Sequence, residues 1–222
     1  MIEFHRVSKV YAVGLVKVPA LSDVSFRVDK GEFVILAGPS GAGKTTLMRL
    51  LYRDTLATEG EVKVLGLPMA DLRRSEVVEL RRSIGIVFQD AKLLPGRTVF
   101  ENIAFVLRVT GVPRSEITSR VFDALRSVGI SARAQSSPAQ LSQGEAQRAS
   151  LARAIARKPA LLIADEPTAN VDDAMASELI DVLKYIWARG TTVLLATHQA
   201  RLALRLKQRM LVLDHGRLVK DG

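Results

Sequence analysis

The fold of this chain is decided by a stretch near its start, which reads Phe33-Val34-Ile35-Leu36-Ala37-Gly38-Pro39-Ser40-Gly41-Ala42-Gly43-Lys44-Thr45. The five apolar residues that begin it predict a strand buried on both faces, as in a parallel sheet. The glycine-rich segment predicts a tight loop, and residues 45–52 continue with a helical pattern. A strand, a loop and a helix in direct succession are typical of an α/β protein.

The loop fits the pattern G-x-x-x-x-G-K-[ST], which is typical of phosphate-binding loops. Glycines let main-chain N–H groups surround phosphate oxygens, and the following helix adds N–H donors and its positive dipole end. The Lys44 ammonium would contact the terminal phosphates, and the Thr45 hydroxyl would reach Mg²⁺. The predicted nucleotide contacts are Gly38, Pro39, Ser40, Gly41, Ala42, Gly43, Lys44, Thr45 and Thr46.

Two adjacent carboxylates, Asp165 and Glu166, follow the apolar run at residues 161–164. Ligands of open α/β sheets bind at the carboxyl ends of the strands. Asp165 is therefore expected to hold Mg²⁺, directly or through water, and Glu166 to act as general base toward a water that attacks the γ-phosphate. Taken alone, such a pair is as often a solvated turn; the upstream loop favours catalysis.

Three more residues follow or precede strand-like runs. Gln89 comes directly after the apolar residues 84–88, where its amide can bridge Mg²⁺ or water and sense the γ-phosphate. His198 ends the run at 192–197 and is expected to contact the γ-phosphate, the alternative being a structural histidine. Tyr11 is expected to stack on adenine; the alternative is an aromatic side chain with a packing role.

A second helix start has phosphate-binding chemistry. The segment Leu141-Ser142-Gln143-Gly144-Glu145 precedes a helical pattern at residues 145–157. A serine hydroxyl and a bare glycine backbone at the start of a helix form another anion-binding arrangement. One chain thus carries two such helix starts, which suggests a nucleotide shared between two copies.

The rest of the chain is divided by its patterning. Alternation at residues 2–7 and 24–28 and apolar runs at 192–197 and 210–213 predict strands, the last turning back through residues 214–216. Residues 91–157 are helical in pattern and rich in Arg and Ala, with breaks at 111–113 and 136–138. We predict one nucleotide-binding domain, 1–222, with an α/β core at 1–90 and 158–222 and a helical subdomain at 91–157.

Composition excludes several classes of protein. There is no cysteine, which excludes disulfides and thiolate chemistry, and only three histidines, which argues against a zinc site. No apolar run reaches bilayer length and no signal peptide precedes the first strand, so we expect a cytoplasmic chain. The 32 basic and 23 acidic residues give a net charge of +9, which favours an acidic partner: nucleic acid, anionic lipid or nucleotide.

The order of these motifs resembles that of ATP-binding-cassette ATPases over essentially the whole chain. The order is Tyr11, the glycine-rich loop, Gln89, the signature segment Leu141–Glu145, Asp165-Glu166, Asn170-Val171-Asp172 and His198. The resemblance implies a P-loop NTPase fold: a RecA-like core sheet, an N-terminal antiparallel β subdomain and an inserted α-helical subdomain. It also implies ATP hydrolysis with Mg²⁺.

The resemblance further implies a homodimer in the ATP-bound state. Each ATP would lie between the glycine-rich loop of one chain and Ser142 and Gly144 of the other, with Val171 and Asp172 near the seam. Two positions depart from the family pattern. Gln143 and Ala169 stand where glycine is usual, and Gln143 bears on the efficiency of hydrolysis.

Within the family, the chain is most similar to the cell-division ATPases, and residues 80–102 carry that similarity. The triplet Arg97-Thr98-Val99 discriminates modestly against the lipoprotein-releasing and macrolide-exporting ATPases, which share most other features. These ATPases pair with an integral membrane protein of the FtsX type and couple ATP turnover to control of peptidoglycan hydrolases. The resemblance implies a peripheral location on the cytoplasmic face of the bacterial inner membrane. It also implies that the region Gln89–Val99 and the inserted helices contact the membrane partner.

Two alternatives stay open. The chain could serve a transporter of lipoproteins, macrolides or amino acids, with the same chemistry and another membrane partner. A nucleic-acid ATPase of the family is opposed by the single cassette and the lack of a long coiled coil, so we expect no nucleic acid as partner. The positive charge instead suits the anionic inner leaflet through Arg201, Arg205, Lys207 and Arg209, although a solvated helix face explains these residues equally well.

Overall fold

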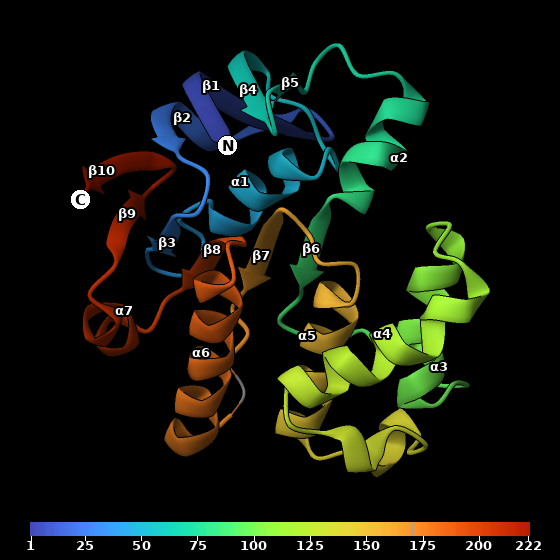
Figure 1. The fold of residues 1–222 in the computed structure, drawn as a ribbon. Helices are drawn as coiled ribbons and strands as arrows, with labels where there is room; N and C mark the ends of the chain where they lie inside the picture. Colours follow the sequence, from blue (N-terminus) through green and yellow to red (C-terminus); the bar gives the residue numbers. More distant parts are fainter. Residues whose placement is uncertain (170) are drawn as a thin grey trace. The chain divides into compact units, whose positions relative to one another are not determined.

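The computed structural model describes residues 1–169 and 171–222 (Figure 1). Asn170 lies outside the described residues, as do the side chains of Val13, Ala200 and Arg201, so the predictions for Asn170 and Arg201 have no structural counterpart here. The chain divides into two compact units. The first comprises Met1–Arg81 and Thr192–Gly222, and the second comprises Arg82–Thr191.

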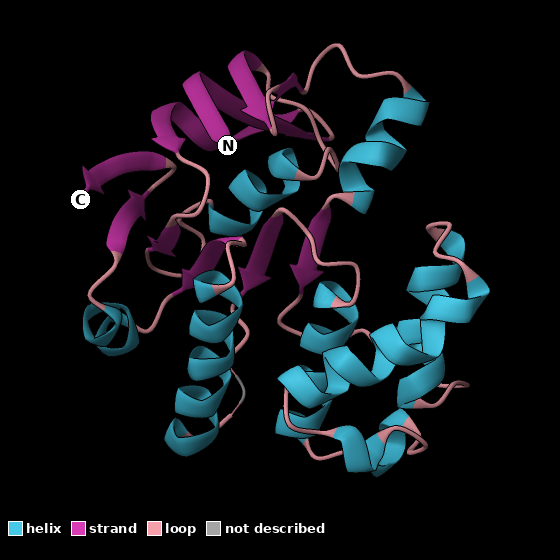
Figure 2. Ribbon diagram, in the orientation of Figure 1, coloured by secondary structure: helices cyan, strands magenta, loops and turns pink. Residues whose placement is uncertain are grey.

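The first unit is built mainly from strands (Figure 2). An antiparallel sheet has the strand order β2-β1-β4-β5, and in the other sheet β3 pairs in parallel with both β8 and β9, with β10 antiparallel to β9. The elements are β1 (Ile2–Val13), β2 (Val16–Val28), β3 (Phe33–Ala37), α1 (Lys44–Leu51), β4 (Glu59–Val64), β5 (Leu67–Pro68), α2 (Arg74–Arg82, which ends at the unit boundary), β8 (Thr192–Thr197), α7 (Ala200–Leu206), β9 (Arg209–Asp214) and β10 (Arg217–Asp221).

The strands of the first unit follow the predicted patterns. The first four residues of β3 are buried, as its continuous apolar run predicted. Strand β2 alternates between buried and more exposed residues in its second half. The rings of Phe4 and Phe26 stack across the β1–β2 pair with centroids 4.7 Å apart. Both N-terminal strands are longer than predicted. Residues 8–11 of β1 are half-buried and residues 16–19 of β2 are exposed, so neither stretch alternates between buried and exposed residues.

The second unit joins a parallel strand pair to a set of helices. Strand β6 (Ile84–Val87) pairs in parallel with β7 (Leu161–Asp165). The helices are α3 (Val99–Val109), α4 (Arg114–Ser127), the 3₁₀ turns η1 (Ser131–Arg133) and η2 (Pro138–Gln140), α5 (Gln143–Ile155) and α6 (Asp173–Ala188). The predicted breaks at 111–113 and 136–138 are confirmed, since they separate α3 from α4 and fall at η2. None of the described helices is long and apolar enough to span a bilayer.

Candidate functional site

The glycine-rich loop leaves the end of β3 and leads into α1, as predicted. Gly38, Gly41 and Gly43 all have positive φ, at 153°, 81° and 104°. A Cβ at Gly38 would meet the Leu213 carbonyl oxygen, and one at Gly43 would lie 2.6 Å from the Ala20 carbonyl oxygen. Gly38 and Gly43 therefore allow the neighbouring backbone to approach closely, while Gly41 serves only the turn.

Lys44 lies at the start of α1 and folds back over the loop. Its side chain is only 6% exposed, and Nζ donates hydrogen bonds to the carbonyl oxygens of Gly38, at 2.8 Å, and Pro39, at 3.0 Å. The N-cap residue of α1 is Gly43, which has no side chain to cap the helix, and the first turn contains no acidic residue. The ammonium and the main-chain N–H groups therefore concentrate positive potential where a phosphate would bind.

The turn between β9 and β10 is hydrogen-bonded to the glycine-rich loop. Gly216 donates its N–H to the Ala42 carbonyl oxygen, at 3.1 Å, and accepts from the Ser22 N–H, at 2.8 Å. A Cβ at Gly216 would lie 2.9 Å from the Ala20 carbonyl oxygen, so glycine is needed there as well. Gly216 thus links the loop and β2, with one main-chain hydrogen bond to each.

Two other predicted residues belong to this unit. Ala37 pairs with Thr197 in the parallel β3–β8 register, so Gly38 and His198 leave the sheet at the same edge. Tyr11 lies on β1, in the antiparallel sheet, with Lys9 Nζ 4.9 Å from its ring centroid. The structure thus brings His198 to the edge where the loop begins and places Tyr11 on a separate sheet.

The acidic pair and Gln89 meet in the second unit. Val87 of β6 pairs with Ala164 of β7, so the segments that contain Gln89 and Asp165 leave adjacent strands at one edge. Glu166 is only 8% exposed and has φ of 48°, which is rare for a residue with a side chain. Such a strained backbone at a buried carboxylate is a common feature of functional sites.

Ser142 is the N-cap of α5 and forms a capping box with Glu145. Its Oγ accepts from the Glu145 N–H, at 3.2 Å, and the Glu145 carboxylate accepts from the Ser142 N–H, at 2.8 Å. This hydrogen bond, together with one from Arg133, lowers the pKa of the Glu145 carboxyl below its ordinary value. Because Ser142 Oγ acts only as an acceptor in the box, its O–H can still donate to an outside oxygen.

Asp172, which we expected near a dimer seam, has a local role as well. Its Oδ1 accepts from the Met175 N–H, at 2.8 Å, as the N-cap of α6. The adjacent Val171 is half-buried. Among the described residues, no cluster of three or more His, Cys, Asp or Glu side chains is suited to a metal ion.

The ABC transporter family model matches residues 21–169. The chain is 43% identical to the cell division ATP-binding protein FtsE of Streptococcus pneumoniae, covering 100% of this chain and 95% of that protein. It is 43% identical to the Escherichia coli FtsE, covering 98% and 97%. This chain belongs to the ABC transporter ATPase family, in its FtsE group.

A solved relative supports the assignment. The ABC ATPase superposes with a TM-score of 0.92 on an ATP-binding cassette solved as a dimer in a post-hydrolysis state bound to ADP and Pi. The two are 32% identical, and the match covers 100% of this chain and 98% of the other. The predicted fold class is therefore confirmed, and the ABC ATPase binds and hydrolyses ATP as the subunit of an FtsE-type cell division system.

Gly144 of this ABC ATPase is packed more tightly than the sequence suggests. It is buried, and a Cβ there would overlap the side chain of Met175, at the start of α6. Met175 in turn lies beside Arg148, which also pairs with Glu178. Glycine at position 144 therefore allows α5 to pack closely against Met175 of α6.

We expect Gly144→Ala to lower the midpoint of thermal unfolding by a few degrees, because overpacking costs about 1–3 kcal/mol. Calorimetry of the single variant and of the Gly144→Ala, Met175→Ala pair measures this. In the Met175→Ala background the added methyl has space, so the midpoint should not fall further. Equal destabilisation in both backgrounds would rule out the contact with Met175 as the cause.

Proposed function

We propose that two copies of this chain enclose each ATP, one through its glycine-rich loop and the other through Ser142 and Gly144. The observation that carries the proposal is the presence of two helix starts that are suited to binding an anion. At α1 the N-cap is Gly43, which has no side chain to cap the helix, and at α5 the Ser142 hydroxyl keeps its hydrogen for an outside acceptor. The dimeric state of the solved cassette is in keeping with this arrangement.

The phosphates would be held by the loop N–H groups and Lys44, with Mg²⁺ beside them. The proposed ligands of the ion are the Thr45 hydroxyl, the Gln89 amide oxygen and the Asp165 carboxylate. All three are oxygen donors, which suits Mg²⁺, and a site completed by phosphate oxygens needs few protein ligands. When bound, the ion neutralises charge on the phosphate oxygens.

Hydrolysis would depend on residues around the γ-phosphate. Glu166 accepts a proton from the attacking water, and its burial keeps the carboxylate away from competing solvent. His198 contacts the γ-phosphate, and Gln89 senses whether that phosphate is present. Tyr11 stacks on the adenine.

The membrane partner would be an FtsX-like integral protein that contacts residues 89–99 and the helical subdomain. Arg97 supports this surface, because its guanidinium stacks on Phe105 with 4.5 Å between Cζ and the ring centroid, which orders a partly exposed cation. Binding to such a partner would give the ATPase a peripheral location on the inner membrane. Arg205 and Lys207 are exposed and suited to anionic lipid, whereas Arg209 is paired with Asp221 and Glu32.

Affinity purification of the tagged chain from membranes, followed by identification of the integral protein that accompanies it, tests this function. We expect Arg97→Glu to reduce recovery of that protein at least about tenfold, because a fixed cation becomes an anion, an effect of about 1.4 kcal/mol or more. Basal ATPase should stay within twofold. Arg217→Glu, the same charge change at an exposed site on β10, is the control. Equal recovery with both variants would exclude Arg97 from the partner surface.

A further inference from the structure

Two side chains of helix α5 donate hydrogen bonds to the main chain that follows β6. Gln147 Nε2 donates to the carbonyl oxygens of Phe88, at 3.2 Å, and Gln89, at 2.8 Å. One turn and a half later, the Arg153 guanidinium donates to those of Ala91 and Lys92, at 2.8 and 2.7 Å. Four carbonyl groups within five consecutive residues are thus bound by two side chains of one helix.

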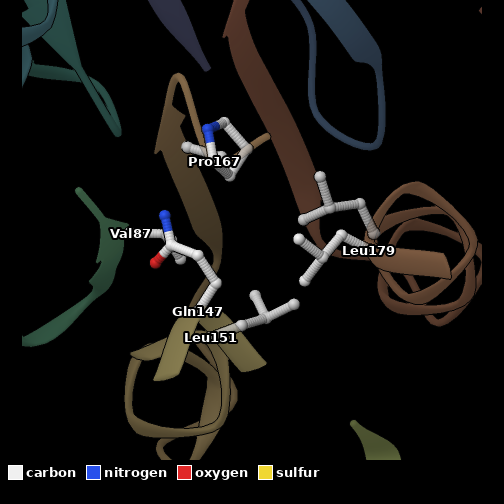
Figure 3. A pocket seen from close by; sticks show the side chains of 7 residues that line it. Val87, Gln147, Leu151, Pro167 and Leu179 are labelled. Carbon is white, nitrogen blue, oxygen red and sulfur yellow. The ribbon is translucent and has the colours of Figure 1, made fainter. Parts of the chain in front are cut away.

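Gln147 is poorly explained by packing. It is 4% exposed and lines a small, largely apolar cavity with Leu151, Pro167 and Leu179 (Figure 3). Its Oε1 is buried and has no hydrogen-bond partner in residues 1–169 and 171–222. A buried acceptor without a partner is costly, so an apolar side chain of the same length would suit the cavity better. What glutamine provides at this position is the pair of N–H donors toward residues 88 and 89.

Arg153 has a similar role at the other end of the segment. Burial lowers the pKa of its guanidinium, and no described carboxylate lies within ion-pair distance. Its half-buried charge is instead satisfied by main-chain carbonyls, which are suited to a planar group with several donors. The contact depends on the fixed position of these carbonyls relative to α5.

Strand β6 and α5 are themselves in close contact. A Cβ at Gly85 of β6 would lie 2.6 Å from the Ala154 carbonyl oxygen of α5. Glycine therefore allows the end of the helix to approach the beginning of the strand. The strand, the helix and the segment between them are held together by backbone contact as well as by the two side chains.

We infer that Gln147 and Arg153 are positioning residues that fix Gln89 to the helix capped by Ser142. The inference rests on the proposed role of Gln89 at the γ-phosphate. Because one helix carries Ser142 at its start and holds the Gln89 main chain at its middle, a change at either residue moves the other. The two proposed contacts with different ATP molecules are thereby coupled within one chain.

The test is Gln147→Met, which keeps the length of the side chain, removes both donors and suits the apolar cavity. In steady-state ATPase assays of the chain with its membrane partner, we expect kcat to fall about tenfold and the KM for ATP to change less than twofold. The thermal midpoint should not fall. Gln135→Met, at an exposed position in the same unit, is the control and should leave all three quantities unchanged.

A double-mutant cycle with Gln89→Ala separates positioning from other roles. If Gln147 acts through Gln89, Gln147→Met should change kcat less than twofold once Gln89 is alanine. The inference would be overturned if the two substitutions lowered kcat in the double variant by the product of their separate effects. An unchanged kcat for Gln147→Met alone would overturn it as well. Full activity of Gln89→Ala by itself would instead overturn the proposed role of Gln89.

Arg153→Lys gives an independent check if Gln147→Met does not fold. An ammonium cannot reproduce the planar pair of bonds to Ala91 and Lys92. The same cycle with Gln89→Ala then applies: we expect a several-fold fall in kcat that disappears in the alanine background. An equal fall in both backgrounds would contradict the inference.

Discussion

Glu166→Gln is expected to lower ATP turnover at least ~10²-fold while ATP affinity stays the same or increases. A general base contributes about 10²–10⁴-fold to such reactions, and an amide of the same shape cannot accept the proton. The residue is 8% exposed, so the isosteric change should preserve the local packing. Removing a negative charge from beside the γ-phosphate removes a repulsion, which is why binding should not weaken.

Phosphate release measures ATP turnover, and calorimetric titration measures ATP affinity. Size-exclusion chromatography with ATP measures the fraction of dimer. Because closure depends on ATP and opening on hydrolysis, the variant should accumulate as a dimer in ATP. Glu3→Gln, at an exposed position on β1, is the matched control. Wild-type phosphate release from Glu166→Gln would show that another group serves as the base.

The sequence predicted the strands and loops of the site because they obey local rules. The apolar run before Gly38 and the two carboxylates at the end of β7 were recognisable from residue type alone, and parallel pairing then brings the segments that contain Gln89 and Asp165 to one edge. Helix α5 was predicted two residues short at its start, since Ser142 as N-cap places Gln143 in the first turn.

Other elements escaped prediction for different reasons. Helix α2 buries only Leu80, so its sequence has almost no apolar periodicity. Helix α6 was missed although the buried residues Ala176, Leu179, Ile180, Leu183 and Ile186 have helical spacing and could have revealed it. The contacts made by Gln147, Met175 and Gly216 are tertiary. Gln147 and Gln89 are 58 residues apart in sequence, and no local pattern joins them.

Lys44→Ala is expected to weaken ATP binding about 10²-fold, equivalent to about 2.7 kcal/mol. The ammonium is almost completely buried, where its attraction to phosphate is less screened than at the surface. The variant also leaves the Gly38 and Pro39 carbonyl oxygens without their donor, so the loop loses an internal contact. Calorimetric titration with ATP, ADP and AMP measures the effect, with Lys30→Ala on the exposed β2–β3 turn as control.

The three nucleotides separate loss of charge from loss of fold. If Lys44 binds the terminal phosphates, affinity should fall most for ATP, less for ADP and little for AMP, because the lost attraction scales with the charge nearest Nζ. A collapsed loop would weaken all three alike. Lys44→Met, which keeps most of the apolar stem, should reproduce the ATP loss with less effect on thermal stability. ATP affinity equal to that of the wild type in both variants would contradict the assignment of the loop to phosphate binding.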